Sequence, residues 1–133
     1  MFDEYAKKLK DIKANVPAVF ERVAKQGAVK ARNEAVKITD EEKLVDTGAY
    51  KRNWHAEGVE VATDTYGVTL INSMEYASHL EWGHKLRNGK RWKGKFVGRR
   101  AIDETRYFCI QKLDDMFNKL YAQYQRSFTK PDS

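Results

Sequence analysis

The fold is set by the stretch from Val45 to Trp54, which reads VDTGAYKRNW. Small and apolar residues recur at helical spacing before this stretch and at strand spacing after it. Asp46, Thr47 and Gly48 form a turn signal, because Asp and Thr side chains bond nearby backbone amides and glycine adopts conformations closed to other residues. We therefore predict that this turn sets the angle between a long helix and the first strand.

The segment before the turn is predicted to be helical over residues 2–37. From Val16 onward, small and apolar residues occupy one helical stripe, namely Val19, Phe20, Val23, Ala24, Gly27, Ala28, Ala31 and Ala35. Because most of these side chains are small, another element can approach the stripe closely. Pro17 lacks an amide hydrogen and disfavours helix at the residue before it, so we expect a break or restart near Asn15.

The segment after the turn favours strands, because β-branched and aromatic residues alternate with polar ones over residues 50–72. We predict a hairpin or meander with its turn at Asp64–Gly67, and a separate strand around residues 50–56 before it. A short helix is expected at Glu75–Trp82. Asn88-Gly89 then predicts a tight two-residue hairpin turn, in which both positions need positive φ.

A second long helix is predicted from Arg99 to Phe128, where apolar residues again fit one face. The order of elements predicts an α+β fold, a small antiparallel sheet of about three to four strands packed by a long N-terminal and a long C-terminal helix. We expect the 133 residues to form a single domain with a modest core. Within it, residues 85–98 are predicted to form a mobile basic loop or hairpin.

Positive charge is concentrated in one stretch that contains no acid. The formal net charge is +6, and eight cations lie close together at Lys85, Arg87, Lys90, Arg91, Lys93, Lys95, Arg99 and Arg100. Without them, 17 basic and 19 acidic residues remain, so the rest of the chain is faintly acidic. A local basic segment indicates a contact surface for nucleic acid or for an acidic partner. Trp92 and Phe96 lie among these cations and could stack on bases.

The chain offers few groups for catalysis. It has three His and one Cys, shows no nucleophile–base pairing in its linear sequence and has no glycine-rich phosphate loop, so we predict no enzymatic activity and no cofactor. His79, Glu81 and His84 are potential metal ligands, but His79 and Glu81 would point to different faces of a helix, so no metal site is expected. An aspartic-protease role for Asp46–Gly48 would need a second, paired carboxylate and a mostly β fold, and the sequence suggests neither. Cys109 is expected to be a buried thiol.

A membrane location is not expected. No apolar run approaches the roughly 18–20 residues that a membrane helix needs. The first residues, Met1 to Glu4, lack a basic region leading into an apolar stretch, so synthesis in a cytosol is expected.

Three strings of residues, in this order and spacing, resemble a tailed-phage family of neck, tail-completion and tail-component proteins. The first is Asp46–Trp54, and the third is Phe96–Ala101, at the entrance to the last helix. The second is Glu75–His84, in which the matching residues are Tyr76, Ala77, Glu81, Trp82 and Gly83. The resemblance covers roughly residues 45–104. Tyr50 departs from it conservatively, since an aliphatic residue is common there.

The resemblance implies a non-enzymatic structural protein of a phage or prophage, made in the bacterial host cytoplasm and located at the virion neck or tail. It would join copies of itself in a ring at the head–tail junction or the head-proximal tail end. Head connector proteins would bind on one side and tail tube or terminator proteins on the other. Genomic DNA would pass through the lumen.

The resemblance also implies roles for particular segments. The second string would be a structural element beside a subunit contact, with Tyr76, Leu80 and Trp82 in the core or the interface. The basic stretch with Trp92 and Phe96 would be a loop that orders against the next subunit or faces DNA. The first alternative is a basic nucleic-acid-binding domain unrelated to phage that uses residues 85–100. The second is a small enzyme that uses His79, Glu81 and His84.

Overall fold

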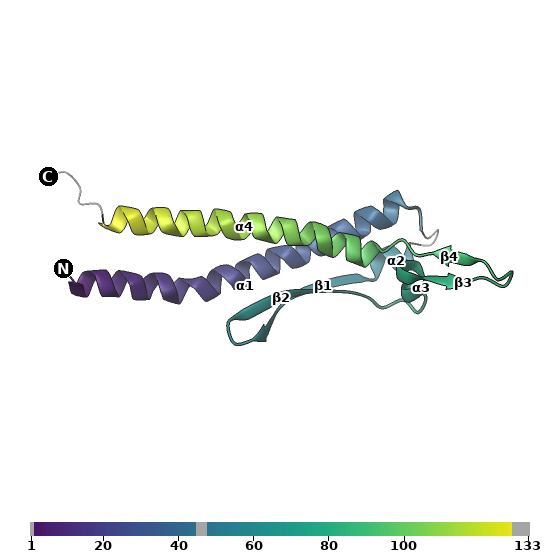
Figure 1. Ribbon diagram of the computed structural model, residues 1–133, viewed down its shortest axis with the longest axis horizontal. Helices are drawn as coiled ribbons and strands as arrows, with labels where there is room; N and C mark the ends of the chain where they lie inside the picture. The colour runs from purple at the N-terminus through teal and green to yellow at the C-terminus, as the bar shows by residue number, and fades with distance from the viewer. Residues whose placement is uncertain (1, 45–47, 129–133) are drawn as a thin grey trace.

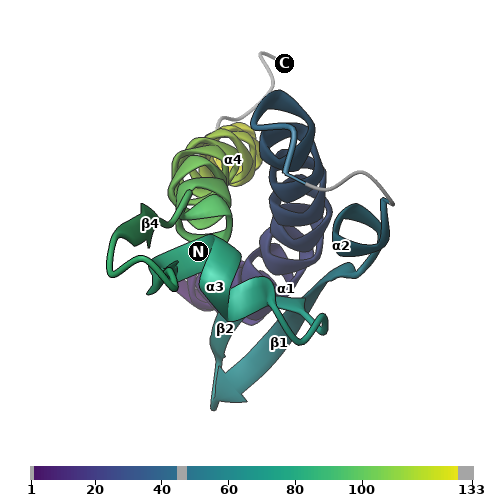
Figure 2. The same ribbon diagram turned by 90° about the vertical axis from the view of Figure 1, so that its right-hand side faces the viewer.

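The structure, a computed structural model, describes residues 2–44 and 48–128. Two long helices, α1 (Phe2–Glu41) and α4 (Val97–Phe128), run antiparallel, so that α1 begins and α4 ends at the same end of an elongated molecule (Figure 1). The end-on view shows a β-hairpin packed against one side of this helix pair (Figure 2). The predicted α+β fold with antiparallel strands and two long helices is confirmed, and the strands of the described residues form two separate two-stranded sheets.

Helix α1 is longer than predicted and continuous through Pro17, so the break expected near Asn15 is wrong. The helix changes direction in its N-terminal part instead (Figure 1), as expected where a proline removes one hydrogen bond from the ladder. At the C-terminal end, the amide of Leu44 donates to the carbonyl of Thr39 at 3.3 Å, and Lys43 has φ 51°. These features form a Schellman motif that ends the helix. Among the described residues, no helix combines the length and apolarity that crossing a membrane requires.

The small-residue stripe of α1 allows close packing, as predicted. A Cβ atom built on Gly58 would lie 2.5 Å from the backbone carbon of Ala24, so the first strand lies directly on the helix backbone. A Cβ atom on Gly27 would lie 2.7 Å from Sγ of Cys109, a residue of α4. Cys109 is only partly buried, and burial raises the pKa of its thiol. The stripe therefore packs against both the hairpin and α4.

The hairpin consists of β1 (Trp54–Ala62) and β2 (Thr65–Asn72), which pair antiparallel from Trp54–Asn72 to Ala62–Thr65. The separate strand expected at residues 50–56 is wrong, because Ala49–Arg52 forms the short helix α2. The turn is also shorter than predicted, with Thr63 and Asp64 at its tip and Gly67 inside β2. Even-numbered residues such as Trp54, Leu70 and Asn72 face the helices, as strand alternation requires.

The best-packed part of the core lies where α1 ends and α4 begins. Its buried residues are Ala35, Ile38, Tyr50, Trp54, Val97 and Ala101. The indole nitrogen of Trp54 donates to Oγ1 of Thr39 at 3.1 Å, and that hydroxyl donates to the carbonyl of Ala35 at 2.7 Å. These two bonds satisfy polar groups that the core would otherwise bury without partners. The strand, the helix and α2 are thus fixed together at this end.

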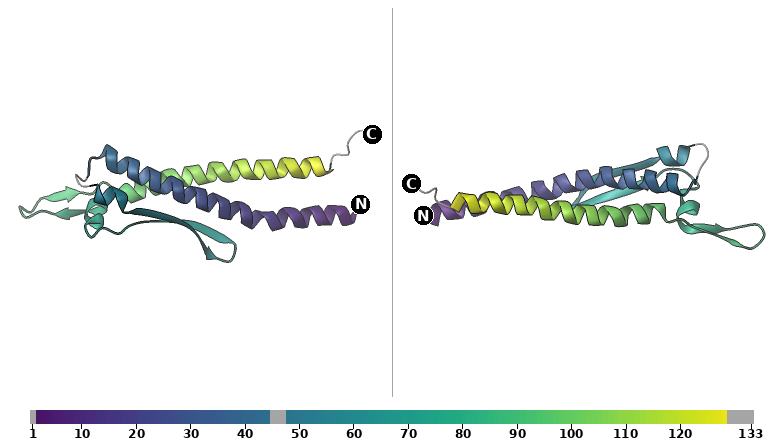
Figure 3. Two further views of the ribbon diagram at one scale, coloured as in Figure 1. Left: turned by 180° about the vertical axis from the view of Figure 1, so that it is seen from behind. Right: turned by 90° about the horizontal axis from the view of Figure 1, so that it is seen from above.

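A short helix and a second hairpin project from the same end. Helix α3 (Ala77–Trp82) is followed by β3 (Gly83–Lys85) and β4 (Arg91–Lys93), which pair antiparallel and extend beyond the two long helices (Figure 3). The amide of Gly89 donates to the carbonyl of Leu86 at 3.0 Å, and the amide of Leu86 donates to the carbonyl of Lys90 at 2.7 Å. Only Gly89 in this loop has positive φ, so it is a three-residue hairpin loop and not the two-residue turn predicted.

Candidate assembly site

The first predicted motif lies at the entrance to α2. Asp46 and Thr47 fall outside the described residues. Gly48 has φ 74° and immediately precedes α2, and its carbonyl accepts the amide of Arg52 at 3.0 Å. The left-handed conformation at Gly48 is one that side chains other than glycine rarely adopt.

Tyr76 and Ala77, from the second string, lie at the edge of the core. Both pack against its buried cluster, and the ring of Tyr76 lies 6.3 Å from the ring of Tyr50. Tyr50 is fully buried, and its hydroxyl has no hydrogen-bond partner among the described residues. Burial, with a smaller contribution from the charge of Glu81, raises the pKa of the Tyr50 hydroxyl. This part of the string holds α3 on the core.

Glu81 caps helix α4. Its Oε1 accepts the backbone amide of Gly98 at 2.7 Å, and its Oε2 accepts that of Arg99 at 3.0 Å. These amides have no partner within the helix, and Phe96, which precedes α4, has no side-chain acceptor to offer them. A carboxylate here also interacts favourably with the positive end of the helix dipole. Glu81 therefore joins α3 to the start of α4.

Gly83 and Gly94 allow the base of the β3–β4 hairpin to close. Gly83 has φ 86°, and a Cβ atom there would overlap the backbone carbonyl of Trp92. A Cβ atom on Gly94 would overlap the carbonyl of Glu81. The amides of Lys95 and Phe96 donate to the carbonyls of Leu80 and Glu81, at 2.8 Å and 3.1 Å. In the Glu-x-Gly part of the second string, Glu81 thus caps α4, and Gly83 lies where two backbone segments pass close to each other.

The imidazoles of His79 and His84 stack on each other instead of converging on a metal. Their ring centroids are 4.9 Å apart, and the ring of Trp92 lies 5.7 Å from that of His84. Glu81 is engaged at the start of α4. Among the described residues, no three His, Cys, Asp or Glu side chains form a group that could hold a metal ion. These rings pack one face of the hairpin against α3.

Trp82 and Phe96 form an exposed aromatic pair at the base of the hairpin. Trp82 is 59 % exposed and Phe96 is 36 % exposed, and their rings meet edge to face at 5.7 Å. Beside them, an open groove of about 560 Å³ lies between α3, β2 and the first turns of α4. Its lining includes Trp82, Leu70 and Ile102 together with the charged Arg99 and Asp103.

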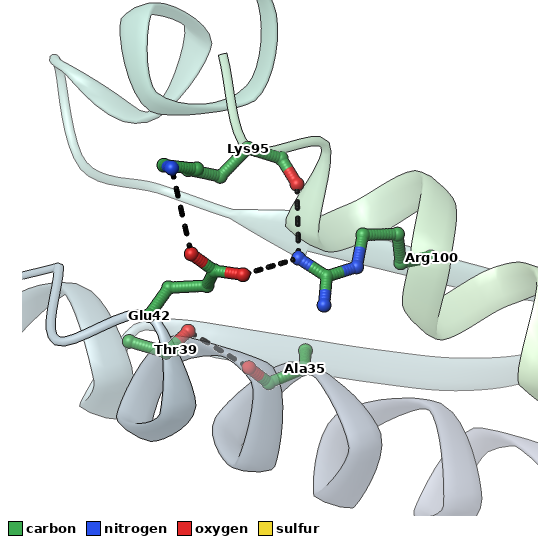
Figure 4. Close-up of polar contacts among 5 residues, drawn as sticks. All are labelled: Ala35, Thr39, Glu42, Lys95 and Arg100. Carbon is green, nitrogen blue, oxygen red and sulfur yellow. Dashed lines mark hydrogen bonds and ion pairs between the residues drawn. The ribbon is translucent and has the colours of Figure 1, made fainter. Parts of the chain in front are cut away.

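Two of the eight predicted surface cations are held within the chain by Glu42. The Nη1 atom of Arg100 lies 3.0 Å from Oε1 of Glu42, and Nζ of Lys95 lies 3.6 Å from Oε2 (Figure 4). The Arg100 guanidinium, with a weaker contribution from Lys95, holds the pKa of the Glu42 carboxyl below its usual value. This cluster fastens the end of α1 to the start of α4.

The other cations face solvent. Arg91 donates a 3.4 Å hydrogen bond to the carbonyl of Trp82. Within residues 2–44 and 48–128, no carboxylate forms an ion pair with any of the six, which are Lys85, Arg87, Lys90, Arg91, Lys93 and Arg99. The structure therefore divides the basic stretch into an internally paired part and an exposed part, which lies on the hairpin except for Arg99 in the first turn of α4.

Glu42 and Gly94 are two structural residues that were not predicted from the sequence. Glu42 lies 58 residues from Arg100 in the chain, and such a distant pair leaves no local pattern. Gly94 lies between two lysines. A glycine within such a charged segment is the signal that another backbone segment approaches closely there.

Comparison with known proteins identifies the family of the chain. The sequence model of the family described as "Bacteriophage HK97-gp10, putative tail-component" matches residues 3–83. Because the match spans more than half of the 133 residues, the chain belongs to this family of phage tail components. No curated protein and no solved structure matches the chain.

The family match confirms the resemblance and shifts its limits. It starts in α1 and ends at Gly83, whereas the resemblance was expected over residues 45–104. The second string is almost wholly inside the match, and the string Phe96–Ala101 is outside it. The family description is that of a structural part of the virion tail, in line with a non-enzymatic role.

Proposed function

We propose that this tail component assembles as a ring of identical subunits at the head–tail junction, or at the head-proximal end of the tail. Connector proteins of the head would bind one side of the ring, and tail tube or terminator proteins the other. The proposal is supported by the family membership and by one observation, the exposed Trp82–Phe96 pair beside an open groove.

The aromatic pair has the properties of an interface anchor. Aromatic side chains are enriched in the cores of protein interfaces, where a few of them carry most of the binding energy. Trp82 lies at the end of α3, and the two hydrogen bonds of Glu81 fix that end against the first turn of α4. A rigidly held aromatic residue loses little conformational entropy on binding. We therefore assign Trp82 and Phe96 to the subunit contact, in place of the Trp92 anchor suggested by the sequence.

A single substitution tests the proposal. In phage carrying Trp82→Ala, we expect heads filled with DNA and separate tails, because subunits that cannot associate leave the junction open. The measurement is the ratio of joined particles to free heads and tails in electron micrographs of lysates. Joined particles at the wild-type ratio would overturn the assignment of Trp82.

Tyr107→Ala is the matched control. Tyr107 lies on α4, is 71 % exposed and is not part of the groove lining. The Tyr107→Ala substitution should leave head–tail joining unchanged. If Tyr107→Ala blocks joining and Trp82→Ala does not, the subunit contact lies on the long helices. Equal melting temperatures of both purified variants and the wild type would show that neither effect arises from unfolding.

A further inference from the structure

The β3–β4 hairpin has two different faces. Pairing places His84 opposite Trp92, and this aromatic face packs against His79 of α3. Because side chains alternate along a strand, the neighbouring positions point to the other face. That outward face carries Lys85 and Arg91, which are directly paired, and Lys93, which is paired with Gly83. All three cations are exposed.

The outward face is unfavourable without an anionic partner. Like charges directly opposite each other on paired strands repel, and Lys85 and Arg91 form such a pair. Arg87 and Lys90 add two exposed cations at the tip. No carboxylate among the described residues forms an ion pair with any of these five residues. The hairpin also projects beyond the long helices, where it can reach a second molecule (Figure 3).

We propose that the outward face of this hairpin, with Lys85, Arg91 and Lys93 at its centre, binds the phosphate backbone of duplex DNA. The inference rests on the proposed function, since a ring at the head–tail junction encloses the path of the genome. Phosphates would neutralise the repelling cations and release condensed counterions. The contact reads no bases, so it would tolerate any sequence passing by.

Two observations favour duplex DNA over the other candidate partners. If the partner were an acidic protein surface, the outward face of the hairpin would be expected to have an apolar centre, since lysine is depleted and aromatic residues are enriched in protein interfaces. The outward face offers cations alone. Single-stranded DNA would be expected to stack on an exposed aromatic ring. Trp92, the aromatic residue of the hairpin strands, is half-buried and packed against His84. The exposed ring of Trp82, at the end of α3, pairs with Phe96 and is assigned to the subunit contact.

The test measures binding of the purified full chain to a fluorescently labelled duplex of mixed sequence as salt is raised. Five phosphate contacts predict a slope of log affinity against log salt of roughly −4 to −5. Affinity should then fall by several hundred-fold, on the order of 10²–10³, between about 50 and about 200 mM salt. In the variant Lys85→Gln, Arg91→Gln, Lys93→Gln the slope should shrink by about 3 and the loss to roughly tenfold.

A charge-matched control separates the hairpin from net charge. Arg22, Lys37 and Lys119 are exposed on the long helices, and changing all three to Gln should leave the slope near that of the wild type. Equal slopes for the two triple variants, or duplex binding that salt does not weaken, would overturn the proposal. So would a hairpin variant that binds duplex normally but fails to join heads to tails, because the face would then be a protein contact.

Failure of this inference is distinguishable from failure of the proposed function. Duplex binding is measured on the isolated chain, whereas ring assembly is judged by head–tail joining in the Trp82→Ala phage. If the hairpin variant binds duplex as the wild type does while Trp82→Ala still prevents joining, only the DNA contact is refuted.

Discussion

The carboxylate of Glu81 accepts the backbone amide of Gly98 at 2.7 Å, although the two residues lie 17 positions apart. This bond connects the string that identified the family to the first turn of α4. It explains why an acid precedes the glycine at this point of the chain. The acid caps a helix, and Gly83 lets the hairpin cross close beside that cap.

Replacing Glu81 should lower the free energy of unfolding. Glu81→Ala leaves two amides at the start of α4 without their carboxylate, and we expect a loss of roughly 2 kcal/mol in the free energy of unfolding. Glu81→Gln, which keeps one acceptor oxygen, should lose less. Glu75→Ala, at an exposed position just before α3, is the control. Denaturant unfolding in which Glu81→Ala matches Glu75→Ala would contradict the capping role.

Two glycines of the β1–β2 hairpin should respond oppositely to the same change. Gly58→Ala places a methyl group 2.5 Å from the backbone of Ala24, so strand and helix must separate, at a cost of about 2 kcal/mol or more. Gly67→Ala would only touch Val61 at 3.6 Å and should be neutral or slightly stabilising. Thermal melts of the two variants test this. Equal destabilisation would mean that β1 does not lie on the backbone of α1.

Removing the hydroxyl of Tyr50 should stabilise the protein. The ring is fully buried, and the hydroxyl has no partner in the described part of the chain. An unsatisfied buried hydroxyl costs on the order of 1 kcal/mol, so Tyr50→Phe should raise the melting temperature by about 4 °C. Tyr50→Ala should be strongly destabilising, by roughly 3–5 kcal/mol, because it leaves a cavity. A lower melting temperature for Tyr50→Phe would show that the hydroxyl is bonded.

The Glu42 cluster should make stability depend on pH in acid. The carboxyl pKa is lower in the folded chain than its ordinary value of 4.5, so the unfolded chain binds more protons as the pH falls. The contribution is therefore complete above about pH 5 and is lost as the pH drops through the folded pKa. Glu42→Gln should be less stable than the wild type at pH 7, and the difference should close in acid.

Glu41→Gln is the control for that experiment, because Glu41 is the exposed neighbouring carboxylate. Its difference from the wild type should be small throughout. Urea unfolding from about pH 7 down to about pH 3 provides the comparison. A Glu42→Gln deficit that stays constant over this range would show that the ion pairs do not form.

The sequence predicted the elements that depend on local periodicity. The stripe of small residues in α1, the alternation in β1 and β2, and the apolar face of α4 each repeat a pattern within a few residues. The predictions failed where packing overrides local preference. Pro17 removes one hydrogen bond from a helix of 40 residues, and packing along the rest of the helix outweighs that loss. Tyr50 has a strand former's side chain but is buried in the helical turn that follows Gly48.

The candidate site was predictable in part, for the same reason. The second string marked the right segment, but the partner of Glu81 is a backbone amide, which every residue carries. The basic stretch was identified as one surface, whereas Glu42 removes Lys95 and Arg100 from it. Trp92 lay among cations in the sequence, yet pairing with His84 turns it to the packed face. Contacts between residues that are not neighbours in the sequence decided each of these outcomes.

The proposed ring can be observed by cryo-electron microscopy of intact virions, with the chain fitted into the density where head and tail meet. We expect a closed ring of identical subunits at the head-proximal end of the tail. In that ring, Trp82 of each subunit lies against the next, and the β3–β4 hairpins point toward the lumen. Density for the chain along the tail, at the distal tip, or as isolated subunits without mutual contact would contradict it.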